Sequence, residues 1–193
     1  MSPYLVEGSN IAVAARSTPL VSDVPPLIYG NKPTDGGHLF LTREERDELL
    51  MHEPQAACWV KKVLGATEFL NAKERWCLWL VGATDDDLQN MPMVQKRVNA
   101  VRDFRTMSPK ASTQKKAATA HLFDEDRHPL SNYILVPRVS SERRTYVPMG
   151  FFDSGTISTD LNNILPNGSR YEFGILSSLL HNDWMRLVAG RLK

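Results

Sequence analysis

The chain has few of the residues and motifs that mark secreted, membrane-spanning or catalytic proteins. Its 193 residues include only two cysteines, Cys58 and Cys77, which excludes a disulfide framework. Both have tryptophan or apolar neighbours, so we expect two small buried side chains in a reducing compartment. No apolar run approaches the ~20 residues of a membrane span, and Met1–Tyr4 lacks the basic and apolar regions of a signal peptide. The sequence therefore predicts a cytoplasmic protein without a membrane partner.

Catalytic and cofactor motifs are also missing. Gly36-Gly37 and Gly150 lack the strand–turn–helix spacing of a nucleotide-binding loop, and no Gly-x-Ser-x-Gly elbow occurs. The five histidines are scattered without metal-ligand spacing. We interpret His181-Asn182-Asp183 as the polar face of a final helix rather than as acid–base chemistry. The sequence therefore predicts no catalytic residue, metal ligand or cofactor within this chain.

Charge is balanced overall but segregated locally. The formal net charge is +1, which excludes a uniformly basic protein, and 42% apolar residues suffice for a packed core. Acidic residues gather at 44–48, 85–87 and 124–126, and basic residues at 96–116 and 138–144. Any nucleic-acid surface must therefore come from one or both basic segments.

The first basic segment carries seven positive charges between Lys96 and Lys116, against one acid, Asp103. Such a run can follow a phosphate backbone, and Lys96, Lys115 and Lys116 are its candidate contacts. The alternative is an ordinary solvated helix, in which Arg97 and Arg105 extend along packed apolar residues.

The second basic segment is denser. Arg138, Arg143 and Arg144 lie within nine residues that also hold two serines and Tyr146. Guanidinium groups and hydroxyls suit phosphate oxygens and base edges, so these arginines are candidate DNA-phosphate contacts. The alternative is a structural network that pairs with Glu142 or with the acidic segments. If the segment is a strand, adjacent Arg143 and Arg144 point to opposite faces.

Short segments of both kinds predict an α+β fold, a single compact domain with an extended N-terminal lead-in over residues 1–35. Thr42 and Glu45 form a capping-box pattern that predicts a helix over 43–52. Further helices are expected after Pro54, at 85–88, from Pro92 with Val94, Val98, Val101 and Phe104 inward, and after Ser177 or Ser178. Expected strands are 38–41, 76–81, 133–136, 145–147, 156–159 and 171–176. We expect 110–119 to be a mobile basic loop and the four tryptophans to lie in the core.

A set of short motifs recurs along most of the chain in a fixed order. They are Asn31–Gly37, Thr42–Asp47, Arg75–Leu80, Pro137–Arg144 with the Tyr-x-Pro-x-Gly-Phe that follows it, Tyr171–Ser178, His181-Asn182, Trp184–Arg186 and Gly190–Lys193. In this order they resemble the target-recognition region of MmeI-like type II restriction–modification enzymes. Those enzymes join an endonuclease, an adenine-N6 DNA methyltransferase and a recognition domain in one chain.

The resemblance implies a division of the chain and a set of partners. Residues 1–35 would link to a preceding methyltransferase domain, and 36–193 would be a DNA target-recognition domain truncated at its C-terminus. Its partners would be double-stranded DNA and the methyltransferase domain of its own parent chain. S-adenosylmethionine and Mg²⁺ would belong to the parent enzyme.

The resemblance also implies base contacts, for which Leu161, Asn162 and Lys193 are the candidates. Lysine reads guanine acceptors in the major groove. The alternative function is a protein–protein docking module that packs on the methyltransferase core and scarcely touches DNA. The apolar segment Trp76–Val81 and the proline-rich lead-in would then form its interface.

Overall fold

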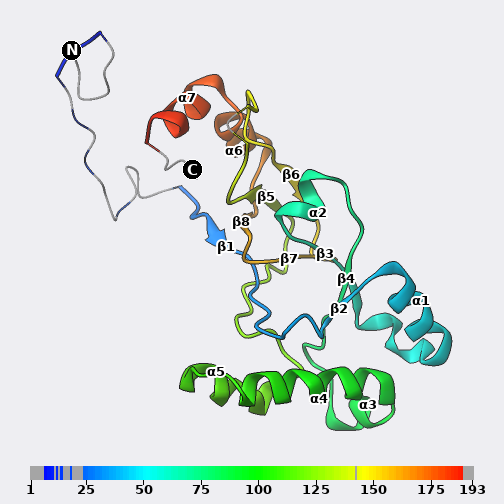
Figure 1. The fold of residues 1–193 in the computed structure, drawn as a ribbon. Helices are drawn as coiled ribbons and strands as arrows, with labels where there is room; N and C mark the ends of the chain where they lie inside the picture. The colour runs from blue at the N-terminus through cyan, green and yellow to red at the C-terminus, as the bar shows by residue number, and fades with distance from the viewer. Residues whose placement is uncertain are drawn as a thin grey trace.

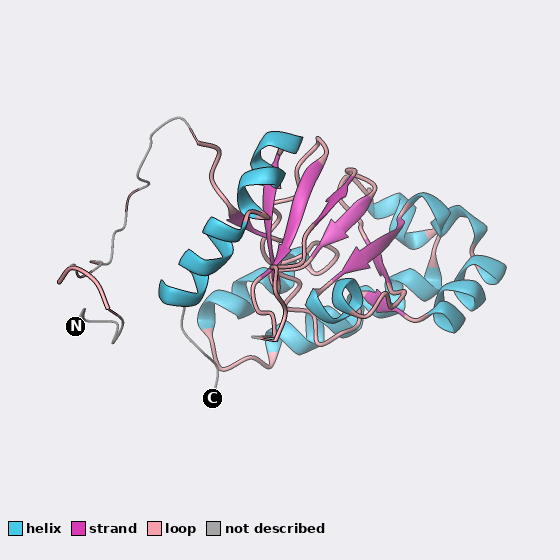
Figure 2. Ribbon diagram, turned by 90° about the horizontal axis from the view of Figure 1, so that it is seen from above, coloured by secondary structure: helices cyan, strands magenta, loops and turns pink. Residues whose placement is uncertain are grey.

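The computed structural model describes residues 7–10, 12, 14, 18, 24–141 and 143–188. Two four-stranded sheets lie at the centre, and helices surround them (Figures 1 and 2). The predicted α+β class is confirmed. None of the described helices is long and apolar enough to cross a lipid bilayer.

The first sheet is antiparallel throughout, in the order β1-β8-β5-β6. Its strands are β1 (Ile28–Tyr29), β8 (Asn162–Pro166), β5 (Tyr133–Pro137) and β6 (Gly150–Phe152). The apolar run that predicted β5 is buried at Tyr133, Ile134 and Leu135. Strand β1 lies within the expected lead-in, so the end of that segment is part of the domain's sheet.

The second sheet has the order β2-β4-β3-β7, and β3 and β7 run parallel. Its strands are β2 (Phe40–Leu41), β4 (Trp76–Leu78), β3 (Val60–Leu64) and β7 (Thr156–Ser158). Because β7 and β8 are separated by only Thr159–Leu161, the chain passes from one sheet to the other within a single turn. This turn is the junction of the fold.

Helices flank the second sheet and the far edge of the first. They are α1 (Arg43–His52), α2 (Ala66–Leu70), α3 (Asp85–Gln89), α4 (Pro92–Thr106), α5 (Ala111–Lys115), α6 (Arg170–Leu176) and α7 (Leu179–Val188), with 3₁₀ turns η1 (Pro54–Cys58) and η2 (Lys116–Thr119). The capping box at the start of α1 is confirmed, since Thr42 Oγ1 accepts from the Glu45 amide at 3.2 Å and Glu45 Oε2 accepts from the Thr42 amide at 2.8 Å. The first turn of α4 is capped by the buried Glu53 carboxylate, which accepts from the Met93 amide at 2.5 Å.

Four expectations of secondary structure are wrong. The helix after Pro54 ends at Cys58, and Val60–Leu64 is a strand because β4 and β7 pair with it on both sides. Residues 171–176 are helical because Ser169 and Glu172 form a capping box like that of α1. Residues 145–147 form a loop instead of a strand, and the expected mobile loop 110–119 is α5 followed by η2.

Two expectations of burial are only half right. Cys77 is buried, and burial raises the pKa of its thiol, but Cys58 is exposed because it ends the 3₁₀ turn η1. Trp59, Trp76 and Trp79 pack against the larger core, whereas Trp184 on α7 is exposed.

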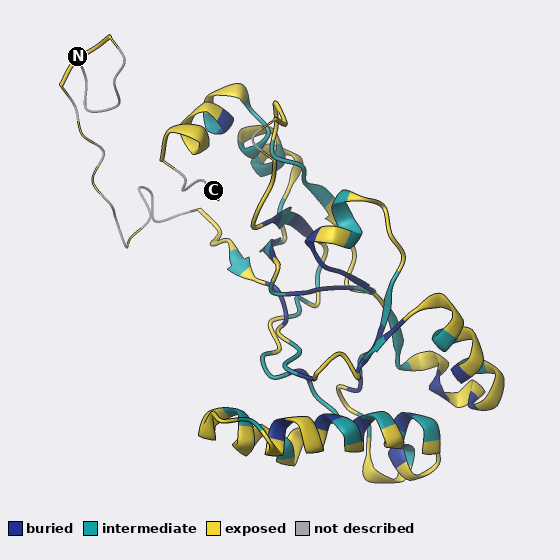
Figure 3. Ribbon diagram, in the orientation of Figure 1, coloured by how far each residue is buried: buried dark blue, intermediate teal, exposed yellow. Residues whose placement is uncertain are grey.

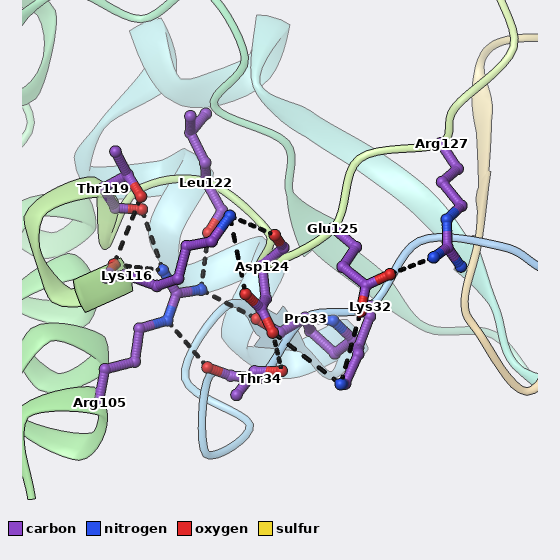
Figure 4. Close-up of polar contacts among 10 residues, drawn as sticks. All are labelled: Lys32, Pro33, Thr34, Arg105, Lys116, Thr119, Leu122, Asp124, Glu125 and Arg127. Atoms are coloured by element: carbon purple, nitrogen blue, oxygen red, sulfur yellow. Dashed lines mark hydrogen bonds and ion pairs between the residues drawn. The ribbon is translucent and has the colours of Figure 1, made fainter. Parts of the chain in front are cut away.

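Arg105 occupies the inward position at the end of α4, where the apolar pattern predicts Phe104. Its side chain has no exposed surface, whereas Phe104 is exposed. All five guanidinium N–H groups donate to backbone carbonyls (Figure 4), those of Pro33, Thr34, Lys116, Thr119 and Leu122, at 2.7–3.0 Å. Burial lowers the pKa of Arg105, and the Asp124 and Asp35 carboxylates act in the opposite direction. Since arginine starts far above neutral pH, the group stays charged. Arg105 therefore joins α4, η2 and the segment after β1.

Replacing Arg105 with methionine should strongly destabilise the fold. Methionine keeps much of the side-chain volume, but the Thr34 and Leu122 carbonyls lose the only donors they have among the described residues. Since each unsatisfied buried acceptor costs ~1–3 kcal/mol, we expect about 3 kcal/mol less free energy of unfolding. Urea titration measures it. Arg102→Met is the matched control, because Arg102 is exposed on the same helix and should change stability by under about 0.5 kcal/mol. Equal effects of the two changes would disprove the role given to Arg105.

Candidate nucleic-acid interface

The second basic segment lies in the long connection between β5 and β6. Arg138, Arg143 and Arg144 are all exposed. Because this segment is a loop, the expected strand geometry of Arg143 and Arg144 does not apply. The two serines hold the loop instead, since Ser141 Oγ accepts from the Arg143 amide and Ser140 Oγ accepts from Arg144 Nη1, both at 3.3 Å. The described carboxylates form no ion pair with these three arginines.

Arg138 brings the two predicted parts of the site together. Its amide donates to the Leu161 carbonyl and its Nη1 to the Asp160 carbonyl, each at 3.1 Å. Its guanidinium lies over the Tyr29 ring, with Cζ 4.5 Å from the ring centroid. The candidate phosphate contact Arg138 and the candidate base-reading residue Leu161 therefore adjoin, beside an aromatic ring.

The sequence did not reveal Tyr29 or Arg127 as parts of this site. Arg127 Cζ lies 5.8 Å from the Tyr29 centroid, so two guanidiniums flank one ring. Tyr29 is 49% and Leu161 55% exposed. We call Tyr29, Arg127, Arg138 and Leu161 the Tyr29 cluster. Only the pairing of β1 with β8 brings Tyr29 here, and no local pattern signals that pairing.

The buried side-chain amide of Asn31 holds the backbone next to the Tyr29 cluster. Asn31 Nδ2 donates to the Ser158 carbonyl at 2.9 Å, and Asn31 Oδ1 accepts from the Arg127 amide at 2.7 Å. The Asn31 carbonyl accepts from the Asp160 amide at 2.9 Å. Neighbouring Gly30 permits this close approach, because a Cβ there would lie 2.2 Å from the Thr159 carbonyl oxygen. Asn31 thus fixes both the Arg127 backbone and the turn that presents Leu161.

Asn162, a candidate base contact, lies inside this junction. It has no exposed surface, and its Nδ2 donates to the Leu64 carbonyl at 2.9 Å. In this conformation its side chain supports the turn, and its role as a base contact stays a prediction. Lys193, the third base candidate, lies outside the described residues.

The candidate lysines lie elsewhere. Lys96 is exposed on α4, and Lys115 and Lys116 are exposed at α5 and η2, which lie at the opposite end of the molecule from α7 in Figure 1. Lys116 Nζ donates to the Asp124 carbonyl at 3.0 Å and lies 3.9 Å from Asp124 Oδ1.

Ion pairs connect Lys116 to the Tyr29 cluster. Lys32 lies within 4.0 Å of Asp124 and 3.6 Å of Glu125, and Glu125 also pairs with Arg127 (Figure 4). Opposite charges alternate along this row, so it carries little net charge. Lys116 is therefore partly neutralised, whereas Arg138, Arg143 and Arg144, like Lys96 and Lys115, form no ion pair with the described residues.

The chain is similar to known proteins over nearly its whole length. The family model described as "MmeI, target recognition domain" matches residues 7–193. The chain belongs to the MmeI target-recognition-domain family. A curated relative, DNA methyltransferase A of Bacillus subtilis (strain 168), is 40% identical over 194 residues, covering 100% of this chain and 22% of the relative.

The fold of the MmeI target-recognition domain is also matched by a solved structure. It is described as the Type IIL restriction-modification enzyme MmeI in complex with DNA, and the TM-score is 0.91 at 39% identity. The match covers 99% of this chain and 25% of that one. This chain thus spans about a quarter of the length of the relatives that it matches. Within the described residues, no three His, Cys, Asp or Glu side chains are grouped to hold a metal ion.

Replacing Asn31 with alanine should loosen the turn below the Tyr29 cluster. The Ser158 carbonyl keeps the Asn31 amide as a donor, but the Arg127 amide loses its acceptor. Because the Arg127 amide is only partly buried, the lost hydrogen bond should cost ~1 kcal/mol, which urea titration resolves. Asn132→Ala is the control, because Asn132 is exposed and its side chain makes no hydrogen bond with the described residues. An Asn31→Ala protein as stable as the control would contradict this role.

Proposed function

We propose that this chain is the DNA target-recognition domain of a bifunctional type II restriction enzyme and adenine-specific DNA methyltransferase. Double-stranded DNA is its partner, together with the methyltransferase domain of its own parent chain. The observation that carries the proposal is the Tyr29 cluster, in which Arg138 is held by two backbone carbonyls next to the exposed Leu161. The Arg138 guanidinium donates to one carbonyl and pairs with no carboxylate of the described residues, so its positive charge stays available to a phosphate.

The residues of the interface divide into positioning and reading roles. Arg138, Arg143 and Arg144 contact phosphates and set the register of the duplex. Leu161 reaches a base edge, where an apolar side chain can contact the thymine methyl group. Lys193 remains a candidate base contact. Lys96, Lys115 and Lys116 contact phosphates only where the duplex extends toward α5.

The chemistry of the parent enzyme lies in its other parts. Methylation of an adenine inside a duplex requires the base to be flipped out of the stack, and recognition holds the DNA while that happens. S-adenosylmethionine would supply the methyl group in the methyltransferase domain, and Mg²⁺ would serve the endonuclease. The described residues here offer neither a metal-ligand group nor a glycine-rich loop. The cytoplasm, where DNA is accessible, remains the expected location.

A second candidate function is a docking module with little direct DNA contact. The observation that favours it is the apolar surface of α6 and α7, where Tyr171, Ile175, Leu179, Leu180, Trp184, Met185, Leu187 and Val188 are exposed. The first expected docking surface is not favoured, because Cys77, Leu78 and Leu80 of the segment 76–81 are buried in the core. The two functions make different predictions for the loss of Arg138, Arg143 and Arg144. A DNA-recognition domain would lose DNA affinity, whereas a docking module would not.

The triple variant Arg138→Ala, Arg143→Ala, Arg144→Ala in the parent enzyme tests the proposal. Each lost phosphate contact lowers the slope of log affinity against log salt by about 1, so we expect a slope about 3 smaller and weaker binding to every duplex. Fluorescence anisotropy over a salt series measures both quantities.

The triple variant Lys96→Ala, Lys115→Ala, Lys116→Ala is the matched control, since it removes the same charge at the other end of the molecule. It should change the slope less. Unchanged affinity in the arginine variant would favour the docking module. A loss confined to the lysine variant would place the DNA at α5 instead.

A further inference from the structure

Helix α7 is attached to the domain by its polar side. Asn182 is its one buried residue among those described. Asn182 Oδ1 accepts from the Val147 amide at 2.7 Å, and Arg186 Nη2 donates to the carbonyls of Thr145 at 2.5 Å and Arg144 at 3.1 Å. The contacts that hold α7 against the loop 144–147 are therefore hydrogen bonds.

The opposite side of α7 is apolar and exposed. Leu180, Trp184, Leu187 and Val188 recur at the spacing of one helical face, and this face points away from that of Asn182 and Arg186. Leu180 is 82% exposed, and the other three are exposed too. Figure 3 shows α7 almost entirely in the exposed colour, in contrast to α4, whose buried residues face the core. An amphipathic helix normally packs its apolar face against the core and exposes its polar face to solvent.

The apolar surface continues onto α6. Tyr171 and Ile175 are exposed there, and Phe173 stacks on Phe151 of β6 with 5.1 Å between ring centroids. Many large exposed apolar side chains on two consecutive helices are typical of a protein–protein contact. Leucine, tryptophan and methionine with few charges resemble the core of a permanent interface.

We propose that the α6–α7 face is an intramolecular docking surface, covered by an apolar surface from another part of the parent polypeptide. The relatives that match this chain are about four times as long. The inference rests on the proposed function, in which this chain is one domain of such a polypeptide and the other domains are therefore present at a high effective concentration. The two charged side chains within α7, Asp183 and Arg186, pair with each other at 2.8 Å and leave no net charge on the helix to attract nucleic acid.

Docking at this face bears on the arginine loop. Arg186 and Asn182 hold the backbone of residues 144–147, directly beside Arg143 and Arg144. A domain that covers the apolar side of α7 therefore also fixes the position of the arginine loop. The inference does not depend on DNA binding, because it concerns the opposite side of the helix.

Cysteine labelling in the full-length parent protein tests the proposal without DNA. Leu180→Cys is compared with Met107→Cys and Met51→Cys, in a background with Cys58→Ser. Leu180 is 82% exposed in this domain and both methionines are 77% exposed, so the three positions are matched. Maleimide labelling, followed by peptide mass spectrometry, gives a rate for each position. Docking predicts that Leu180→Cys is labelled at least about tenfold more slowly than the two controls.

Three other outcomes would overturn the proposal. Equal rates at all three positions would show that the face is open. Protection that disappears on dilution from micromolar to nanomolar protein would assign the face to a second copy. Protection only after DNA is added would assign it to DNA. Hydroxyl-radical footprinting of unmodified full-length protein, comparing Leu180 with the exposed Leu130, gives the same comparison between two leucines if a cysteine variant does not fold. Loss of DNA binding in the arginine variant leaves these readings unchanged.

Discussion

The turn between the two sheets depends on side-chain amides in the interior. The turn from β7 to β8 buries the polar residues Ser158, Thr159 and Asn162, and unsatisfied buried polar groups are costly. The Asn31 and Asn162 side chains donate second hydrogen bonds to the Ser158 and Leu64 carbonyls, which also accept from backbone amides, while Gly30 lets the backbone of residues 30–31 approach Thr159. The position of Leu161, Arg138 and Arg127 follows from these few contacts. The proposed reading surface is therefore as rigid as the junction beneath it.

Arg105 also satisfies inward-facing backbone groups with side-chain hydrogen bonds, at the end of the fold that contains α4 and η2. The carbonyls around the 3₁₀ turn η2 and after β1 face inward, and one guanidinium supplies five donors to them. A buried charge without a carboxylate partner is expensive unless all its hydrogen bonds are made, and here they are. This explains why residues 110–119, which have few apolar anchors, are nevertheless ordered. A basic residue within a basic segment is thus a structural brace rather than a phosphate contact.

The features that the sequence predicted correctly are mainly local. The α1 capping box needs only Thr42 and Glu45, and the burial of Val94, Val98 and Val101 follows from helical spacing. Ser169 and Glu172 carried the same capping signal for α6, but the aromatic and β-branched residues 171–175 favoured a strand. Tyr29 and Arg127 could not be predicted, because their meeting with Arg138 depends on strand pairing over more than a hundred residues. The burial of Asn162 could not be predicted either, because the burial of an amide cannot be inferred from its neighbours in the chain.

The hydrogen bonds that attach α7 to the domain contribute little free energy compared with the apolar side chains that the helix exposes. Its inward side makes a few hydrogen bonds, each worth ~0.5–1.5 kcal/mol net. Its outward side exposes Leu180, Trp184, Leu187 and Val188, and full burial of such a side chain contributes ~1.5–3 kcal/mol. Burying these side chains would therefore stabilise α7 more than its inward contacts do. If the rest of the parent chain covers them, the polar contacts serve chiefly to choose where the helix sits, because hydrogen bonds are directional and apolar contacts are not. The hydrogen bonds from α7 to the arginine loop would then be reinforced by contacts with the rest of the parent chain, which would tie DNA positioning to correct assembly of the domains.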